Sequence, residues 1–362
     1  MPEDLSAFIE TADNRTHLRI ERELGDGYVL LRREEAERRQ AAQDIRCSED
    51  TVIELLRNSR DAGASMIFVA TMLDAGTRRF CVLDNGCGIP AAMHEMVFEP
   101  RVTTKLDTAR LDKWGLHGRG MALYSVKCAC TQAKVQASAV GLGCSMVTAS
   151  DVAALPEKVD QSSFPRFVLE DTGKVKVSGP KNIMRACCEF ALEHRGQVNL
   201  YVGSASEVAA TLLEVGVASY SVAELSLKPD MDVLPLIHRP AFTHSPEEFA
   251  AVCNTLGLRM SARTARRIID GEIAPLRPIT ELIREALEPA EGLEQPTKVQ
   301  AKGRRPRMVR LNAEERARLS REFAETYAGF AERYYLDSDV QPEVRVSGSN
   351  LTVSIPLRTA GV

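Results

Sequence analysis

Over residues 45–150, stretches in which apolar residues recur at helical spacing alternate with short apolar runs of strand length. Apolar residues recur every three or four positions from Ser48 to about Gly63, which predicts a helix with Ser48 as its hydroxyl cap. Two strand-length apolar runs follow, at 66–72 and 79–83. The same patterns then predict helices over 91–98 and 121–130 and strands over 135–138 and 145–149. Alternating helices and strands of this kind predict an α/β sandwich.

The rest of the chain is divided by changes in pattern and composition. A hairpin is predicted around Gly25-Asp26-Gly27, and a helix, a strand and a second helix are predicted within 182–213. Ser245-Pro246 starts a helical region, and 288–308 is rich in Pro, Gly and basic residues. The expected parts are an N-terminal segment (1–45), the sandwich (46–155), an α/β unit resembling a transducer (156–230), a helical module (231–290), and a basic linker with a long helix from Asn312 and a hairpin (291–362).

Composition narrows the class of protein without naming a partner. The 362 residues carry 46 Lys and Arg against 50 Asp and Glu, a net charge of −4, which is ordinary for a globular protein. The nine Cys include no CxxC pair, so we expect reduced core thiols rather than a zinc site or a disulfide framework. No apolar run reaches the length of a membrane span, and the first residues do not form a secretory signal. We therefore expect a cytoplasmic protein.

Three short motifs supply complementary parts of a nucleotide site. In ELLRNSRDAGAS, residues 54–65, the polar side chains of Glu54, Asn58 and Asp61 share one helix face, which suits a hydrated Mg²⁺ and a water molecule. In DNGCGIP, residues 84–90, a carboxylate at a strand end can accept the amino hydrogen of adenine. In GLHGRG, residues 115–120, glycines before a helix favour phosphate. Each motif alone also fits a solvated helix face or a turn; their order and spacing favour a site.

Taken together, these motifs resemble the GHKL superfamily of ATPases. The resemblance covers about residues 45–150, and the motifs resemble most those of MutL, gyrase B and topoisomerase VI B. It implies a two-layer α+β sandwich of the Bergerat type, followed by a mixed α/β and helical C-terminal region, with ATP and Mg²⁺ as ligands.

The resemblance also implies roles for individual residues. Glu54 would be the general base and Asn58 the Mg²⁺ ligand, while Asp84 would bind the adenine amino group. Residues 99–114 would form a lid over ATP. The further ATP-binding positions implied by the motifs are Asp61, Gly86, Gly88, Ile89, Gly115, Leu116, His117, Gly118, Arg119 and Gly120. Lys105 in the lid and Lys298 in the later Gln-Pro-Thr-Lys segment are candidate phosphate ligands, although a solvated lysine is the favoured interpretation of each.

Three functions are compatible with this site. The favoured one is an ATPase whose nucleotide state switches conformation or dimerisation, acting in DNA transactions. Sensor histidine kinases have Asn in place of Glu54 and need an upstream phospho-accepting His, and only His17 precedes the first motif here. Phe98-Glu99-Pro100 does resemble a kinase motif, so a histidine-kinase-like phosphotransferase acting on a protein is an alternative. A nucleotide-sensing scaffold that does not hydrolyse ATP is the third.

Two stretches without acidic residues interrupt the near-neutral charge of the chain. Residues 259–267 contain four Arg, and 298–310 contain several Lys and Arg. Such stretches are candidate contacts for a DNA phosphate backbone or a protein partner, and a solvated helix face with a basic loop is the alternative. Residues 260–268 also resemble, distantly, the helix-two-turn-helix module of topoisomerase VI B.

Overall fold

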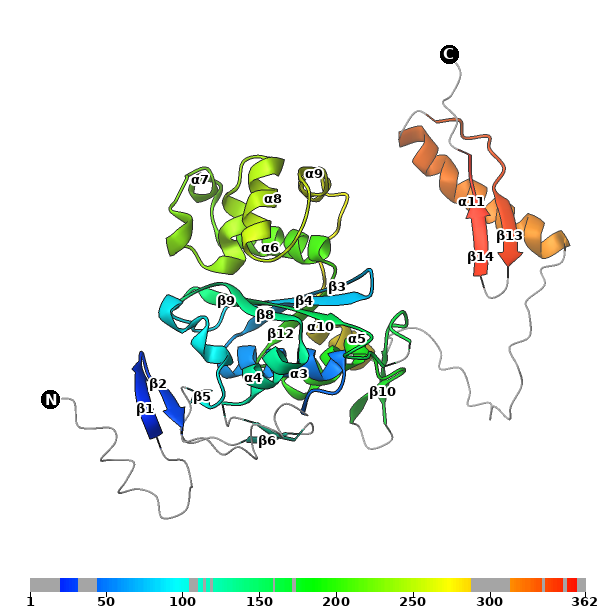
Figure 1. The fold of residues 1–362 in the computed structure, drawn as a ribbon. Helices are drawn as coiled ribbons and strands as arrows, with labels where there is room; N and C mark the ends of the chain where they lie inside the picture. Colours follow the sequence, from blue (N-terminus) through cyan, green and yellow to red (C-terminus); the bar gives the residue numbers. More distant parts are fainter. Residues whose placement is uncertain are drawn as a thin grey trace. The chain divides into compact units, whose positions relative to one another are not determined.

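The computed structural model divides the chain into two compact units, Met1–Glu291 and Gly292–Val362 (Figure 1). The structure describes residues 20–31, 44–103, 110–112, 115–117, 120–158, 160–170, 174–287, 313–333, 336–347 and 350–356. Several predictions fall outside these ranges: the linker over 288–308, the basic segment 298–310 and Asn312.

A five-stranded sheet lies at the centre of the first unit, with the order β12-β3-β4-β9-β8. All neighbours are antiparallel except β12, which runs parallel to β3. The β3–β4 turn is made by Ala75 and Gly76, which both have positive φ, as a tight hairpin requires. The strands are β3 (Met66–Asp74), β4 (Thr77–Asp84), β8 (Gln132–Ala139), β9 (Gly143–Asp151) and β12 (Asn199–Gly203).

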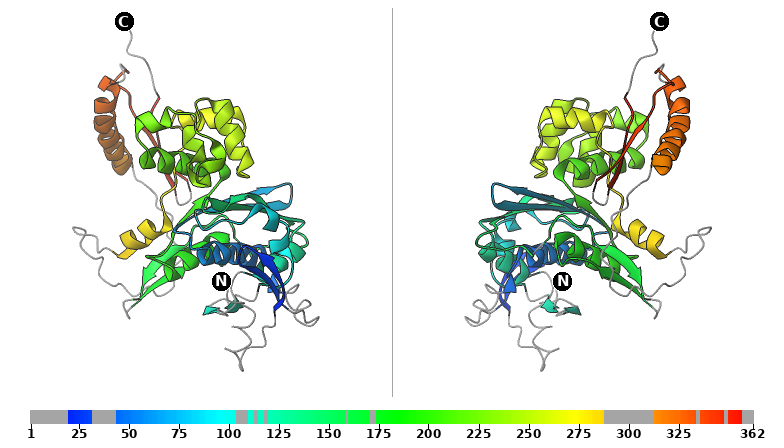
Figure 2. Two further views of the ribbon diagram at one scale, coloured as in Figure 1. Left: turned by 90° about the vertical axis from the view of Figure 1, so that its left-hand side faces the viewer. Right: turned by 90° about the vertical axis from the view of Figure 1, so that its right-hand side faces the viewer.

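Helices cover both faces of this sheet, because alternate strand residues point to opposite sides. On one face, Ile67 and Val69 pack against α3 (Ser48–Asp61), α4 (Ala122–Ala129) and α5 (Ile183–Glu193). On the other, Phe68 and Leu83 pack against α6 (Ala205–Ser219), the 3-10 helix η4 (Leu236–Phe242), α8 (Pro246–Thr255) and α9 (Ala262–Ile269). The side views in Figure 2 show the sheet between these two helical layers. The α/β fold class with a following helical region is confirmed.

The structure differs from the sequence prediction in how the parts combine. The strand predicted near 198–202 becomes β12, which joins the central sheet beside β3 instead of belonging to a separate unit. The helices between 205 and 269 cover the face of the sheet that a two-layer sandwich would leave open. Strand periodicity identifies β12 but does not say which sheet edge it extends, since that choice depends on contacts distant in sequence.

Short elements complete the first unit. The predicted N-terminal hairpin is present as β1 (Ile20–Gly25) and β2 (Tyr28–Leu31), and β2 also pairs with β5 (Val102–Thr103). The helix predicted over 91–98 is instead two 3-10 turns, with Met93 N–H donating to Pro90 O at 2.8 Å. The remaining elements are η1 (Ala91–Met93), η2 (Met96–Phe98), β6 (Arg110–Asp112), β7 (Gly115–His117), β10 (Arg166–Leu169), β11 (Val175–Ser178), α7 (Val222–Leu225), η3 (Met231–Val233) and α10 (Ile279–Leu287).

Helix α3, which carries the first motif, begins at Ser48, the residue that was predicted to be its N-cap. Cys47 is the N-cap of α3, with an extended backbone, and makes no side-chain cap bond. Ser48 is therefore inside the helix, and its buried hydroxyl has no hydrogen-bond partner in the described part of the chain. Asp50, in the first turn, ties the preceding chain to the helix, since its carboxylate accepts the Arg46 backbone N–H at 3.0 Å. The prediction of a Ser48 cap was wrong because local sequence does not fix where the chain turns.

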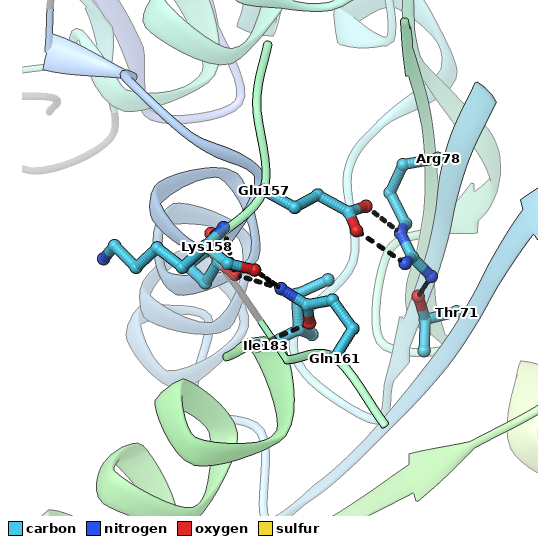
Figure 3. Close-up of polar contacts among 7 residues, drawn as sticks. Thr71, Arg78, Glu157, Lys158, Gln161 and Ile183 are labelled. Atoms are coloured by element: carbon cyan, nitrogen blue, oxygen red, sulfur yellow. Dashed lines mark hydrogen bonds and ion pairs between the residues drawn. The ribbon is translucent and has the colours of Figure 1, made fainter. Parts of the chain in front are cut away.

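Partly buried polar contacts hold the segment after β9 against β3, β4, α3 and α5 (Figure 3). The Arg78 guanidinium forms a bidentate ion pair with Glu157 and donates to Thr71 Oγ1 at 3.0 Å. The Glu49 carboxylate accepts from Gln161 Nε2 at 2.7 Å, and Gln161 Oε1 accepts the Ile183 backbone N–H at 3.1 Å. Because Glu49 starts α3 and Ile183 starts α5, these bonds fix the two helices relative to each other.

The second unit is a helix with a hairpin. Helix α11 (Ala313–Arg333) buries Tyr327 and Ala331 with Val340. The predicted hairpin is present as β13 (Glu343–Ser347) and β14 (Asn350–Ser354), paired antiparallel.

The cysteines agree with the expectation of reduced thiols. All nine are free, and the buried ones are Cys47, Cys81, Cys144, Cys187, Cys188 and Cys253. Burial raises the pKa of the Cys81 thiol to about 11, so it stays protonated at neutral pH. The described residues contain no group of His, Cys, Asp and Glu that could hold a metal ion, and none of their helices has the length and apolar content of a membrane span.

Candidate nucleotide-binding site

A pocket lies between the polar face of α3, the loop after β4, the β2–β5 strands and the start of α4. Glu54, Asn58 and Asp61 line it from α3, as the helical spacing predicted. Gly88 and Ile89 line it from the loop, and Gly120 from the approach to α4. The remaining lining residues are Tyr28, Arg57, Ala62, Cys87, Val97, Val102, Thr103, Ala122 and Leu123.

Charged side chains on α3 are paired along the helix. Arg57, almost fully buried, forms an ion pair with Glu54 one turn earlier. Asp61 accepts from Arg60 at 2.8 Å, and Arg60 also contacts His194 Nε2 at 3.1 Å. Asn58 Nδ2 makes a long contact of 3.9 Å with Met146 Sδ on β9. The side chains of the first motif are thus held in place by neighbours on α3, α5 and the sheet.

Asp84 ends β4 as a buried carboxylate, with 3% of its surface exposed. Its Oδ2 accepts from the Ser59 hydroxyl at 2.7 Å, and its Oδ1 accepts from the Gly86 N–H at 2.8 Å. Burial raises the pKa of Asp84, and these two hydrogen bonds oppose that rise because they favour the charged form. A buried carboxylate fixed by two donors is a rigid acceptor for a third donor from a ligand.

The loop after Asp84 has no room for side chains at its glycines. A Cβ on Gly88, whose φ is +71°, would lie 1.9 Å from the Ala139 carbonyl oxygen. A Cβ on Gly86 would lie 2.9 Å from Ala62 Cβ. Both glycines are therefore required by the close approach of this loop to α3 and to the β8–β9 turn.

Side-chain bonds fix the same loop at both ends. Asn85 Oδ1 accepts the backbone N–H groups of Ser65 and Met66, at 2.9 and 2.8 Å. Ile89 N–H donates to the Ser138 hydroxyl at 2.8 Å. The loop that follows β4 is thus a preformed wall of the pocket.

The segment that leads into the predicted lid is also constrained. Arg101 N–H donates to Gly120 O at 2.8 Å, so the two ends of the segment 101–120 meet. Both residues have positive φ, 65° for Arg101 and 68° for Gly120. A Cβ on Gly120 would lie 3.0 Å from Val102 O, so this crossing requires glycine.

Comparison with known proteins agrees with this arrangement. Residues 45–153 match the family described as histidine kinase-, DNA gyrase B-, and HSP90-like ATPase. Residues 45–153 thus form a domain similar to those of the GHKL ATPase superfamily, which the three motifs also resemble.

Two curated relatives of this chain are DNA mismatch repair proteins named MutL. The MutL of Thermus aquaticus is 40% identical over 84 residues, which cover 23% of this chain and 15% of that protein. The MutL of Parabacteroides distasonis is 34% identical over 130 residues, which cover 34% of this chain and 21% of that protein. The matched segments thus span about a fifth or less of the relatives' lengths.

Not every residue predicted for the GHKL site lies on the pocket wall. Asp84 and Gly86 lie behind it, next to the lining residue Ala62. Gly115, Leu116 and His117 form strand β7, paired with β6, rather than a loop at the helix start. Lys105, Gly118, Arg119 and Lys298 lie outside the described residues.

Tyr28 and Cys87 are lining residues that the sequence analysis did not single out. Cys87 lies inside the second motif, between its glycines. It could have been predicted by assuming that every residue of this loop is close to the ligand. Tyr28 lies on β2, far from the motifs in sequence, and reaches the pocket because β2 pairs with β5. Burial, and then the proximity of Cys87, raise the pKa of Tyr28 to about 12, so its phenol stays neutral at physiological pH.

Proposed function

We propose that this protein binds and hydrolyses ATP with Mg²⁺, and that the bound nucleotide switches its conformation or dimerisation. The observation that carries the proposal is that Glu54 and Asn58 of α3 line the same pocket as Gly88 and Gly120. The buried carboxylate of Asp84 adjoins the wall of that pocket. A carboxylate, an amide and glycine-containing loops around one pocket suit the reacting water, the metal ion and the phosphates of a nucleoside triphosphate.

The donor set fits Mg²⁺. Mg²⁺ in nucleotide sites takes one or two protein oxygens together with phosphates and water. Asn58 offers a side-chain amide oxygen on the pocket wall, since its amide nitrogen contacts Met146. When bound, the ion would neutralise the negative charge that develops on the phosphates. Asn58 is the residue that we assign to it.

Glu54 is our candidate for the residue that acts on water. Its carboxylate lies on the pocket wall, one helical turn before Asn58. The Arg57 guanidinium pairs with this carboxylate and fixes its position on the pocket wall. We propose that Glu54 orients the attacking water and takes its proton.

The phosphates would be held by the glycine motif and the lid. Gly120 lies on the pocket wall just before α4, where backbone N–H groups at a helix start favour anions. Gly115, Leu116 and His117 in strand β7, together with Gly118 and Arg119, are further candidates for phosphate binding, and Lys105 and Lys298 are candidate side-chain ligands.

Tyr28 is expected to contribute contact area to the bound nucleotide. Tyr28→Ala removes an aromatic wall of the pocket and should weaken ATP binding about five- to tenfold, within the range of one aromatic–base contact. Tyr28→Phe keeps the ring and should bind ATP like the wild type. Titration of an ATP analogue into both variants by calorimetry measures the difference, and equal weakening by Phe would assign the effect to the hydroxyl instead.

The proposal is tested by measuring phosphate release from MgATP by the full chain, with and without duplex DNA. Turnover supports an ATPase. A stable phosphorylated protein in place of phosphate release would establish the phosphotransferase, and ATP binding without turnover would establish a sensing scaffold. We include duplex DNA because the relatives are named for DNA mismatch repair, and we propose DNA as the partner of the switch.

A further inference from the structure

The helices α8 and α9 form a compact corner on the face of the sheet opposite the nucleotide pocket (Figure 1). Asn254, near the end of α8, closes the corner with two bonds to Met260, each of 3.1 Å. Gly257 turns the chain with a φ of +87°. Leu256 and Leu258 are fully buried, so the corner is a packed element rather than a loose connection.

Hydrogen bonds fasten this corner to the central sheet. The Leu256 carbonyl accepts from the Ser145 hydroxyl at 2.7 Å and from the Cys81 thiol at 3.2 Å. The Thr255 carbonyl accepts from Gln136 at 3.1 Å. Because Cys81, Ser145 and Gln136 lie on β4, β9 and β8, three neighbouring strands hold the corner in a fixed orientation.

Helix α9 has an apolar side that packs inward and an outer side that carries arginines. Ala265 and Ile268 are buried against the α6 and α8 layer. Arg259, Arg263 and Arg266 are all exposed. Arg263 and Arg266 lie three positions apart on α9 and therefore share one side of the helix, and Arg259 lies in the connection just before the helix. We call these three residues the arginine row.

The arginine row has no carboxylate partner within the described part of the chain, whereas nearby exposed arginines do. Arg267, on the same helix, pairs with Glu272 at 2.8 Å, and Arg277 pairs with Glu281 at 3.3 Å. A group of exposed guanidinium groups without carboxylates is suited to an external anion. The planar guanidinium matches phosphate oxygens in particular.

We propose that the arginine row binds the phosphate backbone of duplex DNA. Binding to the phosphate backbone needs cationic side chains in fixed positions and does not need side chains that recognise bases. The anchored corner supplies such cations in the arginine row. The row and the nucleotide pocket are on opposite faces of the sheet, so DNA and ATP can be bound at once. The inference extends the proposed function by naming the surface for its DNA partner, but it requires no ATP turnover.

The test measures binding of the full chain to a labelled duplex by fluorescence anisotropy, between about 50 and 200 mM salt. Each lost phosphate contact lowers the slope of log affinity against log salt by about 1. The double substitution Arg263→Gln and Arg266→Gln should therefore lower that slope by about 2 and weaken binding at low salt at least about tenfold. ATP turnover without DNA should not change, which separates this proposal from the proposed ATPase.

The matched control is the double substitution Arg267→Gln and Arg277→Gln. It removes the same charge from arginines that already have carboxylate partners, and it should leave the affinity and the slope close to those of the wild type. Equal losses in the two double variants would overturn the proposal. So would failure of the wild type to bind duplex at the lowest salt, or tighter binding to polyglutamate than to duplex, which would assign the row to an acidic protein.

Discussion

Glu54→Ala is expected to lower ATP turnover by about 10²- to 10⁴-fold while ATP binding is retained, because a positioned general base contributes about that factor. The side chain lines the pocket beside Asn58 and is an ion-pair partner of the buried Arg57, so the Tm of Glu54→Ala must be compared with that of the wild type to show that the fold persists. Glu54→Gln, which keeps the volume and removes the proton acceptor, should lose turnover to a similar extent. Phosphate release and calorimetric ATP binding, measured on the same samples, separate the two effects.

The control for Glu54 is Glu95→Ala, which removes an exposed carboxylate between the two 3-10 turns. Its turnover should equal that of the wild type. Turnover in Glu54→Ala equal to that of the wild type would show that another group activates the water. A loss of ATP affinity as large as the loss of turnover would instead assign Glu54 to binding.

Asp84→Asn is expected to weaken ATP binding by about 10- to 100-fold, since a hydrogen bond to a charged acceptor contributes about 1.5–3 kcal/mol. The substitution preserves the shape of the side chain but replaces one of its two acceptor oxygens with a donor. The bond from the Gly86 N–H to Oδ1 can persist, and the Ser59 hydroxyl can rotate to accept. The loss should therefore appear in nucleotide affinity rather than in folding.

Stability gives an independent readout for Asp84. Burial raises the pKa of this carboxyl, so ionising it costs more in the folded protein than in the unfolded chain. The wild type should therefore lose stability relative to Asp84→Asn as pH rises above 3.8, the ordinary value of the group. The variant should have an equal or higher Tm at neutral pH. A lower Tm would mean that Asp84 is a structural residue.

The matched control for Asp84 is Asp74→Asn, at the other end of the same β-hairpin. Asp74 is exposed, and its pairing with Thr77 belongs to the turn rather than to the pocket. We expect it to leave ATP affinity unchanged.

The sequence was sufficient to predict the local elements that build the site. The helical spacing of Glu54, Asn58 and Asp61 predicted their common face, and all three line one pocket. Alternation and turn residues predicted β3 and β4 because these strands are adjacent in sequence and joined by a tight turn. The sequence placed Gly88 in the second motif, but only the folded chain shows that a Cβ at this position would lie 1.9 Å from the Ala139 carbonyl oxygen.

Other features depended on contacts between distant segments. The N-cap of α3 is Cys47 and not the predicted Ser48, and two 3-10 turns stand in place of the helix predicted after Pro90. Tyr28 reached the pocket only through pairing of β2 with β5. No local pattern encodes these outcomes, since each depends on which backbone groups and surfaces meet in the folded chain.

The sequence alone therefore determined the family motifs, the polar face of α3 and the α/β class, because these follow from residue types at short, fixed spacings. The tertiary structure decided that β12 extends the sheet and that α6, α8 and α9 cover its second face. It also decided that Arg259, Arg263 and Arg266 point outward from an anchored corner. Burial and pairing of this kind are set by long-range packing, whose partners a single sequence does not specify.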